Sequence, residues 1–271
     1  MRGGGALAAA ALALAAASPA SAGMPILPEY APPHRYGTVI LDSSSTAAGM
    51  APVAFDHWRH RLLYTCRLCH VDVGFAVQAG GTRISAETNR RRLHCGACHN
   101  GKTQHLGSPI FAACSDSPDR PPAPACARCH GREARLRGEY ARFASKKPRD
   151  GAGLIDWLAA ERLAFDAPVD FVEGVSVRPD RLKIDRNFSI SIDGTWLGDV
   201  AFSHQQHARW NGCEGCHPEI FPSTSRGAAA YRMKDIVAGE YCGACHNKVA
   251  FPLAACMRCH RMPPDVTAPR R

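Results

Sequence analysis

One five-residue pattern, Cys-x-x-Cys-His, constrains this chain more than any other feature of its sequence. It occurs six times and uses twelve of the thirteen cysteines. In each copy the two thiols can add to the vinyl groups of a porphyrin, and the adjoining His can ligate the iron from one side. The pattern therefore predicts six covalently attached c-type haems, at Cys66/Cys69/His70, Cys95/Cys98/His99, Cys126/Cys129/His130, Cys213/Cys216/His217, Cys242/Cys245/His246 and Cys256/Cys259/His260.

Structural zinc and disulfides are the two other common uses of paired cysteines. Four-thiolate zinc sites contain paired Cys-x-x-Cys units, but they do not need a His directly after each one. A disulfide within each pair leaves the same His unexplained. The sequence therefore favours haem over both. The remaining Cys114 is interpreted as a remnant of an internal repeat, with an intermolecular disulfide as the alternative.

The amino terminus has the form of a signal peptide. An Ala- and Leu-rich run from Ala6 to Ala17 is followed by the small-x-small sequence Ala20-Ser21-Ala22. We expect cleavage after residue 22 and a periplasmic protein, because c-type haems are attached outside the inner membrane; an extracellular or outer-membrane-associated location is the alternative. The apolar run is too short to span a bilayer as a helix, although a retained anchor is a second alternative. No integral membrane segment is expected after the signal.

The two halves of the chain repeat one another at a shift of 147 positions. The segment that begins at Val53 matches the one at Val200, and the first two motifs of each half are 29 residues apart. The third motif breaks this spacing, because the first half has about 17 extra residues around 105–122, which predict a surface loop. We therefore expect a signal peptide (1–22), a first triheme unit with an N-terminal extension (23–130), a linker (131–199), a second triheme unit (200–260) and a flexible tail (261–271).

Each unit is too small to bury a conventional core of its own. The expected fold is therefore a multihaem cytochrome with little regular secondary structure, in which short helices and short strands surround the haems. Without haem the chain should be largely unfolded. Helical composition is found at 132–143 and 154–163 in the linker, and short strands are expected at 188–194 and 36–41.

Seven histidines lie outside the motifs, and four of them form a repeated Phe-x-His-x-x-His element. His57 and His60 in the first half, and His204 and His207 in the second, begin nine residues before the first haem cysteine of their unit. An iron with only its motif His keeps an open sixth position, whereas a second protein ligand closes it. The doublets are thus predicted to supply sixth ligands.

These residues give the chain a resemblance to the class III multihaem cytochromes, specifically the triheme cytochrome c7 type and its tandem-repeat relatives. The resemblance covers residues 53–130 and 200–260, and it includes an identical Cys-Gly-Ala-Cys-His-Asn block at 95–100 and 242–247. It implies that the first His of each doublet ligates the first haem of its unit and the second His the third haem. The implied partners are His57 with Cys66/Cys69, His60 with Cys126/Cys129, His204 with Cys213/Cys216 and His207 with Cys256/Cys259.

The middle haems depart from this pattern. Met233 lies nine residues before Cys242, and the resemblance to tandem triheme domains implies that it is the sixth ligand of the Cys242/Cys245 haem, which would raise that haem's potential. An ordinary buried thioether is the alternative. The first unit has Ala86 at the equivalent position, so His94, His105, His34 or no residue at all is left for the Cys95/Cys98 haem, the candidate open site.

Haems with closed coordination favour electron transfer over catalysis. The sequence predicts an electron carrier, not an enzyme, in an anaerobic-type respiratory chain, between a membrane-associated donor and a reductase or an outer-membrane conduit. The alternatives are a reductase with an open Cys95/Cys98 haem and an oligomeric conductive assembly in which His34 ligates a neighbouring chain's haem. The formal charge of +9 does not indicate nucleic acid, because six haems would add about twelve propionate charges.

Overall fold

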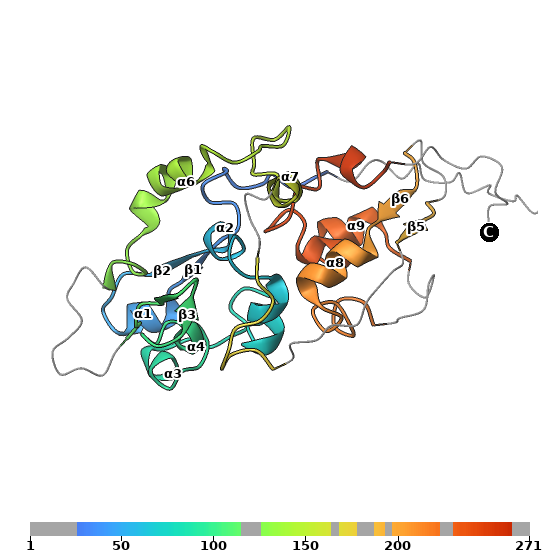
Figure 1. Cartoon of the computed structure of the whole chain (residues 1–271). Coiled ribbons are helices and arrows are strands. Elements are labelled where there is room, and N and C mark those ends of the chain that lie inside the picture. Colours follow the sequence, from blue (N-terminus) through green and yellow to red (C-terminus); the bar gives the residue numbers. More distant parts are fainter. Residues whose placement is uncertain are drawn as a thin grey trace, which may run out of the picture.

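The computed structural model describes residues 26–114, 126–163, 168–177, 187–192, 197–222 and 230–261. The first part of the chain and the last part form two groups of short elements that lie side by side (Figure 1). Helices of the segment between them run along one edge of both groups. The predicted signal peptide and most of the predicted tail lie outside the described residues.

The first group is built around a two-stranded antiparallel sheet. Strand β1 (Thr38–Leu41) pairs with β2 (Val53–Asp56), and β2 leads directly into α2 (His57–His60), so the doublet follows a fixed strand. The remaining elements are α1 (Ser43–Ala47), the π-helical turn η1 (Leu68–Asp72), α3 (Ala86–Arg90), α4 (Cys95–Cys98), β3 (Gln104–His105) and β4 (Ser108–Pro109).

The second group repeats this plan. Strand β5 (Phe188–Ile190) pairs antiparallel with β6 (Val200–Phe202), which leads into α8 (His204–Asn211) and the second doublet. The other elements are α9 (Met233–Val237) and the 3₁₀ turns η3 (Tyr241–Ala244) and η4 (Cys256–Arg258).

A glycine inside the middle motif of each unit allows a close helix contact. A Cβ on Gly96 would lie 1.8 Å from the Asn89 carbonyl oxygen, and a Cβ on Gly243 would lie 1.8 Å from that of Ile236. Asn89 and Ile236 occupy equivalent positions on α3 and α9. The repeated Cys-Gly-Ala-Cys sequence therefore serves packing as well as haem attachment, because only glycine fits at this approach.

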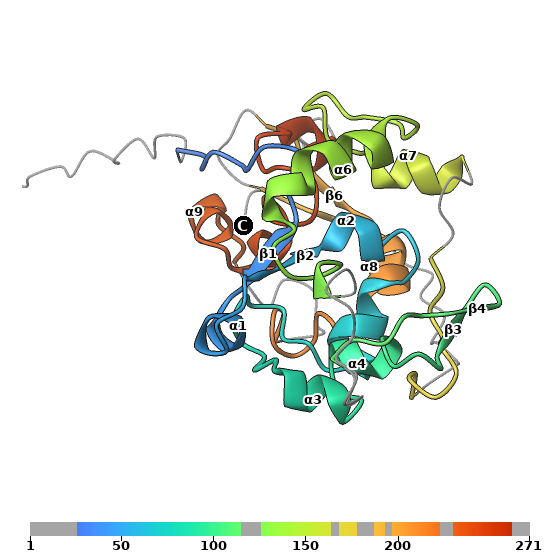
Figure 2. The same ribbon diagram turned by 90° about the vertical axis from the view of Figure 1, so that its left-hand side faces the viewer.

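The linker between the units is part of the structure of the first unit. Its helices are η2 (Glu133–Arg135), α6 (Leu136–Ala144) and α7 (Trp157–Arg162). The doublet residue Trp58 forms one hydrophobic cluster with Tyr140, Ala144 and Ile155. Seen from the first unit, α6 and α7 extend across the top of the molecule (Figure 2). The segment that sequence analysis describes as a linker therefore supplies core residues.

The secondary structure predicted from the sequence is largely confirmed. Both linker helices form, and so do the strands expected before each doublet, although residues 193 and 194 lie outside the described part. The expected loop at 105–122 begins with the small β3–β4 hairpin, and its residues 115–122 are not described. Within the described ranges, no helix is long and apolar enough to cross a membrane.

Candidate functional site: the haem-attachment motifs

Backbone carbonyls fix the orientation of five of the six motif histidines. The His70 Nδ1 lies 2.8 Å from the Phe75 carbonyl oxygen, and the equivalent His217 Nδ1 lies 2.7 Å from that of Phe221. His246, His130 and His260 make the same contact with Phe251, Ala51 and Gly198, at 3.1, 2.7 and 2.9 Å. An Nδ1–H donated to a carbonyl leaves Nε2 as the free ligating nitrogen, which is the usual outer-shell arrangement of a metal-binding His.

The third motif of each unit docks against the strand that precedes the doublet. His130 forms an antiparallel bridge with Val53, and His260 forms the equivalent bridge with Val200. The Ala201 amide also donates to the Cys259 carbonyl at 3.0 Å. These contacts fold the end of each unit back onto its beginning, so the motifs surround one shared interior.

The doublet histidines are held in the same way in both units. His60 Nδ1 lies 3.0 Å from the Asp56 carbonyl oxygen, and His207 Nδ1 lies 2.8 Å from that of Ser203. The preceding phenylalanine stacks on the second His in each unit, with 4.5 Å between ring centres and 29° between ring planes. The Phe of the Phe-x-His-x-x-His element therefore orients the second histidine.

Three doublet histidines face motif histidines. The ring centres of His57 and His70 are 6.3 Å apart and the rings are nearly parallel, at 4°. His60 and His99 are also 6.3 Å apart, and His207 and His246 are 6.4 Å apart. Two nitrogen–metal bonds of about 2 Å each would place the ring centres about 6 Å apart, once the ring radii are added. These pairs therefore fit two imidazoles that bind one iron from opposite sides.

This pairing differs from the one implied by the resemblance. We expected the second His of each doublet, His60 or His207, to serve the third motif, but each faces the middle motif of its unit instead. The reason is that His130 is docked at Val53, and the strand Val53–Asp56 carries the chain away by about 3.3 Å per residue before His60 is reached. A haem at Cys95/Cys98, which we expected to have the open site, would thus have His60 opposite its motif His.

The remaining proposed ligands are placed less closely. His204 contacts Phe188 and Phe202, and no ring contact joins it to His217, although both residues are described. In the first unit the doublet's first His is held by the Gly37 carbonyl at 2.8 Å; position 186, which is equivalent to Gly37 in the register of the second sheet, lies outside the described residues. Met233 begins α9, which packs on η3 of the middle motif.

Two of the three spare histidines of the first unit pack against aromatic rings. His94 lies 5.6 Å from the Phe75 ring and His105 lies 5.1 Å from the Tyr64 ring. One ring nitrogen of each is buried without a hydrogen-bond partner in the structure. Neither makes a ring contact with a motif His in the described part of the chain, so the geometry favours the doublets over these residues as ligands.

Burial keeps the facing histidines neutral. It lowers the pKa of His57, His99 and His246 to about 4, so these rings carry no proton on the second nitrogen at neutral pH. A neutral imidazole is the form that ligates a metal. Burial also raises the pKa of the Cys69 and Cys95 thiols to about 12, with Cys98 and Cys129 as close neighbours that add to the effect. The thiols therefore face a common apolar interior.

An ion-pair network ties the first doublet to the third motif and to the linker. Asp56, which is fully buried, accepts from Arg132 at 2.6 Å, and Arg132 also pairs with Glu139 of α6 at 2.5 Å. Burial raises the pKa of Glu139, but the hydrogen bond and the charge of Arg132 outweigh it and lower this pKa below its usual value. Sequence analysis missed this network, because no spacing relates Asp56 to residues so far along the chain.

The cysteines form no competing structure. None of the thirteen cysteines is joined in a disulfide, and the described residues contain no group of three or more His, Cys, Asp or Glu side chains arranged to hold a metal ion on their own. The paired thiols, the adjoining His with a free Nε2 and the opposing His thus form a donor set that fits a covalently bound haem.

Comparison with known proteins agrees with this geometry. The model of the family of cytochrome c7 and related cytochromes c matches residues 53–131 and 200–261, which are the two segments that carry the repeat. No curated protein matches the chain.

Two solved structures are similar to the chain. One is the N-terminal hexaheme fragment of GSU1996, with 23% identity over 83% of this chain and 98% of that one. The other is dodecaheme cytochrome c GSU1996, with 21% identity over 87% of this chain and 77% of that one, and the TM-score is 0.25 in both cases. The family model covers more than half of the chain, in both repeats, and the chain is therefore a multihaem c-type cytochrome of the cytochrome c7 family.

Proposed function

We propose that this protein is a periplasmic hexahaem electron carrier of an anaerobic-type respiratory chain. Haem supplies a reversible one-electron couple when bound, and a sixth protein ligand restricts it to electron transfer. The observation that carries the proposal is the set of facing histidine pairs, His57 with His70, His60 with His99 and His207 with His246. Each pair would close the coordination of one iron.

The other sixth ligands follow from the repeat and from the pairs already assigned. We assign His204 to the Cys213/Cys216 haem, because its counterpart His57 faces the first motif of its own unit. His207 faces His246, so Met233 is not needed for the Cys242/Cys245 haem and is assigned to the Cys256/Cys259 haem. Burial, and after it the Cys259 thiol, raises the pKa of Cys242, so the middle motif, on which the Met233 helix packs, is a neighbour of the third motif.

The redox partners are proposed to be a membrane-associated donor and a reductase or an outer-membrane conduit. Such partners usually meet through small, transient contacts guided by charge. The exposed basic segment 90–92 on and after α3 is one surface where an acidic partner could dock. Export is supported by the N-terminal sequence and by the covalent attachment chemistry.

A second candidate function, small-ligand binding or reduction at an open iron, is favoured by one observation. Ala86 stands on α3 where Met233 stands on α9, and both helices pack in the same way on the middle motif. The Cys126/Cys129 haem therefore lacks the thioether that its counterpart in the second unit would have. The candidate open iron is therefore the one at Cys126/Cys129 and not the one at Cys95/Cys98, which we expected from the sequence.

Carbon monoxide added to the fully reduced protein tests both functions. We expect one haem at most to shift its absorption, because the other five have a proposed sixth ligand. The Met233→Ala variant should bind one further equivalent of carbon monoxide. Ala86→Met, at an exposed position, should abolish any absorption shift that carbon monoxide causes in the natural protein. Optical titration with carbon monoxide measures the number of binding haems.

Two results would contradict the carrier function. One is carbon monoxide binding to several haems of the natural protein. The other is catalytic reduction of nitrite or hydroxylamine by the reduced chain. If Met233→Ala leaves the carbon monoxide stoichiometry unchanged, the methionine assignment is wrong even though the carrier function stands.

A further inference from the structure

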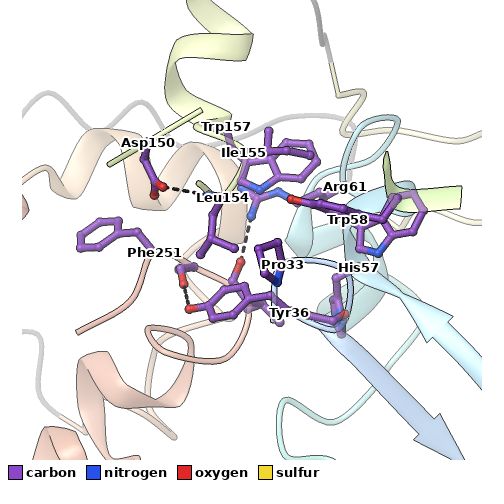
Figure 3. A pocket seen from close by; sticks show the side chains of 14 residues that line it. Pro33, Tyr36, His57, Trp58, Arg61, Asp150, Leu154, Ile155, Trp157 and Phe251 are labelled. Atoms are coloured by element: carbon purple, nitrogen blue, oxygen red, sulfur yellow. Dashed lines mark hydrogen bonds between the residues drawn. The ribbon is translucent and has the colours of Figure 1, made fainter. Parts of the chain in front are cut away.

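The side chain of Arg61 joins all three parts of the chain. Its guanidinium carbon lies 4.4 Å from the ring centre of Trp157 in the linker and 5.4 Å from that of Trp210 in the second unit. Its Nη1 also donates to the Val249 carbonyl at 3.1 Å. Arg61 directly follows the first doublet helix, so a residue next to His60 is fixed by contacts outside its own unit (Figure 3). We call Arg61, Trp157 and Trp210 the arginine clamp.

A cavity next to the clamp is lined by residues of both units and of the linker. Tyr36 and His57 line it from the first unit, Val249 and Phe251 from the second, and Ile155 from the linker. The Tyr36 hydroxyl donates to the Ala250 carbonyl across it. The proposed ligand His57 thus lies beside the segment that follows the motif residue His246.

Linker carboxylates hold the second unit at the same place. Asp150 and Asp156 pair with Arg258, at 3.2 and 3.6 Å, and Arg258 lies inside the last attachment motif. Glu161 on α7 accepts from the Trp210 indole at 3.1 Å. The linker is therefore a bridge with contacts on both units and not a loose spacer.

The attachment motifs of the two units also touch directly. Arg67 lies inside the first motif, between Cys66 and Cys69, and it is held by paired contacts to Asp72 at 2.8 and 2.9 Å and to Asp170 at 3.2 Å. A Cβ on Gly212, the residue before Cys213, would lie 2.7 Å from Arg67 Cδ. The first motif of one unit is thus in contact with the first motif of the other.

Cys66 of the first motif lies beside the clamp. It lines a second cavity together with Arg61, Trp157 and Trp210. A haem-attachment cysteine of the first unit is therefore next to Trp210 of the second unit.

We propose that Arg61 is a positioning residue that holds the Cys66–His70 motif against the motifs of the second unit, and that this contact joins the two triheme units electronically. The inference rests on the proposed electron-transfer function. Electron exchange falls steeply with the distance between carriers, so the way the units are held decides how well they communicate. The two cation–π contacts of Arg61 and its hydrogen bond to the Val249 carbonyl act together to keep this junction closed.

The Arg61→Ala variant tests the clamp in the full haem-loaded chain. Cys114, the one cysteine outside the motifs, offers a natural attachment point for a ruthenium photosensitiser on the first unit, because it follows Ala113, whose amide donates to the His99 carbonyl at 2.9 Å. A light flash then injects electrons into the first unit, and their spread over both units is followed optically. We expect Arg61→Ala to slow this later phase about tenfold, which corresponds to about 1.4 kcal/mol of barrier.

Arg59→Ala is the matched control. Arg59 also lies over an indole, that of Trp58 at 4.9 Å, but its ion pairs are with Asp56 at 3.9 Å and Glu139 at 3.0 Å, which both lie outside the second unit. This variant should leave the later phase unchanged. The haem content and the reduction potential of each haem should be the same in both variants. A general loss of structure would change both quantities. Arg61→Lys, which keeps the charge, should recover part of the rate.

An unchanged later phase in Arg61→Ala would overturn the inference. If that variant does not assemble with six haems, Trp210→Leu, which removes one face of the clamp, decides in its place. A natural protein that accepts no electrons from the label would instead contradict the proposed carrier function. The two failures are therefore distinguishable.

Discussion

A chain produced without haem attachment is expected to be largely unfolded, whereas the exported chain is folded. The helices are too short to persist alone: the nine-residue α6 is the longest within the described ranges, and isolated helices under about 12–15 residues are marginal in water. Units of this size bury too little apolar surface by themselves. Ring nitrogens of His94, His99 and His105 are also buried without a hydrogen-bond partner.

Circular dichroism and amide hydrogen exchange measure this effect. The chain without residues 1–22, made in the cytoplasm where no haem is attached, should have a weak helical signal and unprotected amides. The exported, haem-loaded chain is the control. A haem-free chain with the spectrum of the control and a cooperative unfolding transition would contradict the view that the haems form most of the core.

Arg132→Ala is expected to destabilise the haem-loaded protein by about 3 kcal/mol, because it leaves the buried Asp56 carboxylate with only the half-exposed Arg59, at 3.9 Å, as a charged neighbour. Arg132 contacts Asp56 at 2.6 Å, Glu139 at 2.5 Å and the Ala54 carbonyl at 3.1 Å. Thr38 is the other donor to Asp56, at 3.2 Å, and a neutral hydroxyl cannot compensate the charge. Denaturant unfolding followed by fluorescence or circular dichroism measures the loss.

Arg135→Ala is the control for this experiment. Arg135 pairs with the same Glu139, but at 3.6 Å and with half of its side chain exposed, so its loss should cost less than about 1 kcal/mol. Adding Asp56→Asn to Arg132→Ala removes the unpaired charge and should restore part of the stability. If Arg132→Ala and Arg135→Ala lower the free energy of unfolding equally, the ion-pair network does not hold the doublet strand.

Much of the architecture could be predicted from local sequence patterns. Short strands are predicted at 36–41 and 188–194, and β1 and β5 occupy these places, whereas their partner strands β2 and β6 were not predicted. Apolar spacing predicts the linker helices α6 and α7. These features depend on residues close together in the chain, where periodicity and spacing carry the information.

The pairing of the second doublet His could not be predicted in this way. Spacing shows that His60 lies one helical turn after His57, but the motif it faces depends on where the third motif docks. That docking is a bridge between Val53 and His130, residues far apart in sequence. The contact of Arg67 with Gly212 and the clamp around Arg61 are likewise invisible to spacing, because they arise from how the two units pack.

The haem content of the exported protein tests the central claim most directly. Intact mass spectrometry, with mapping of the haem-bearing peptides, should find six haems per chain, one at each Cys-x-x-Cys-His motif, and Cys114 as a free thiol. Fewer than six haems, or a motif whose two cysteines are found as thiols, a disulfide or a zinc site, would contradict the assignment of two triheme units.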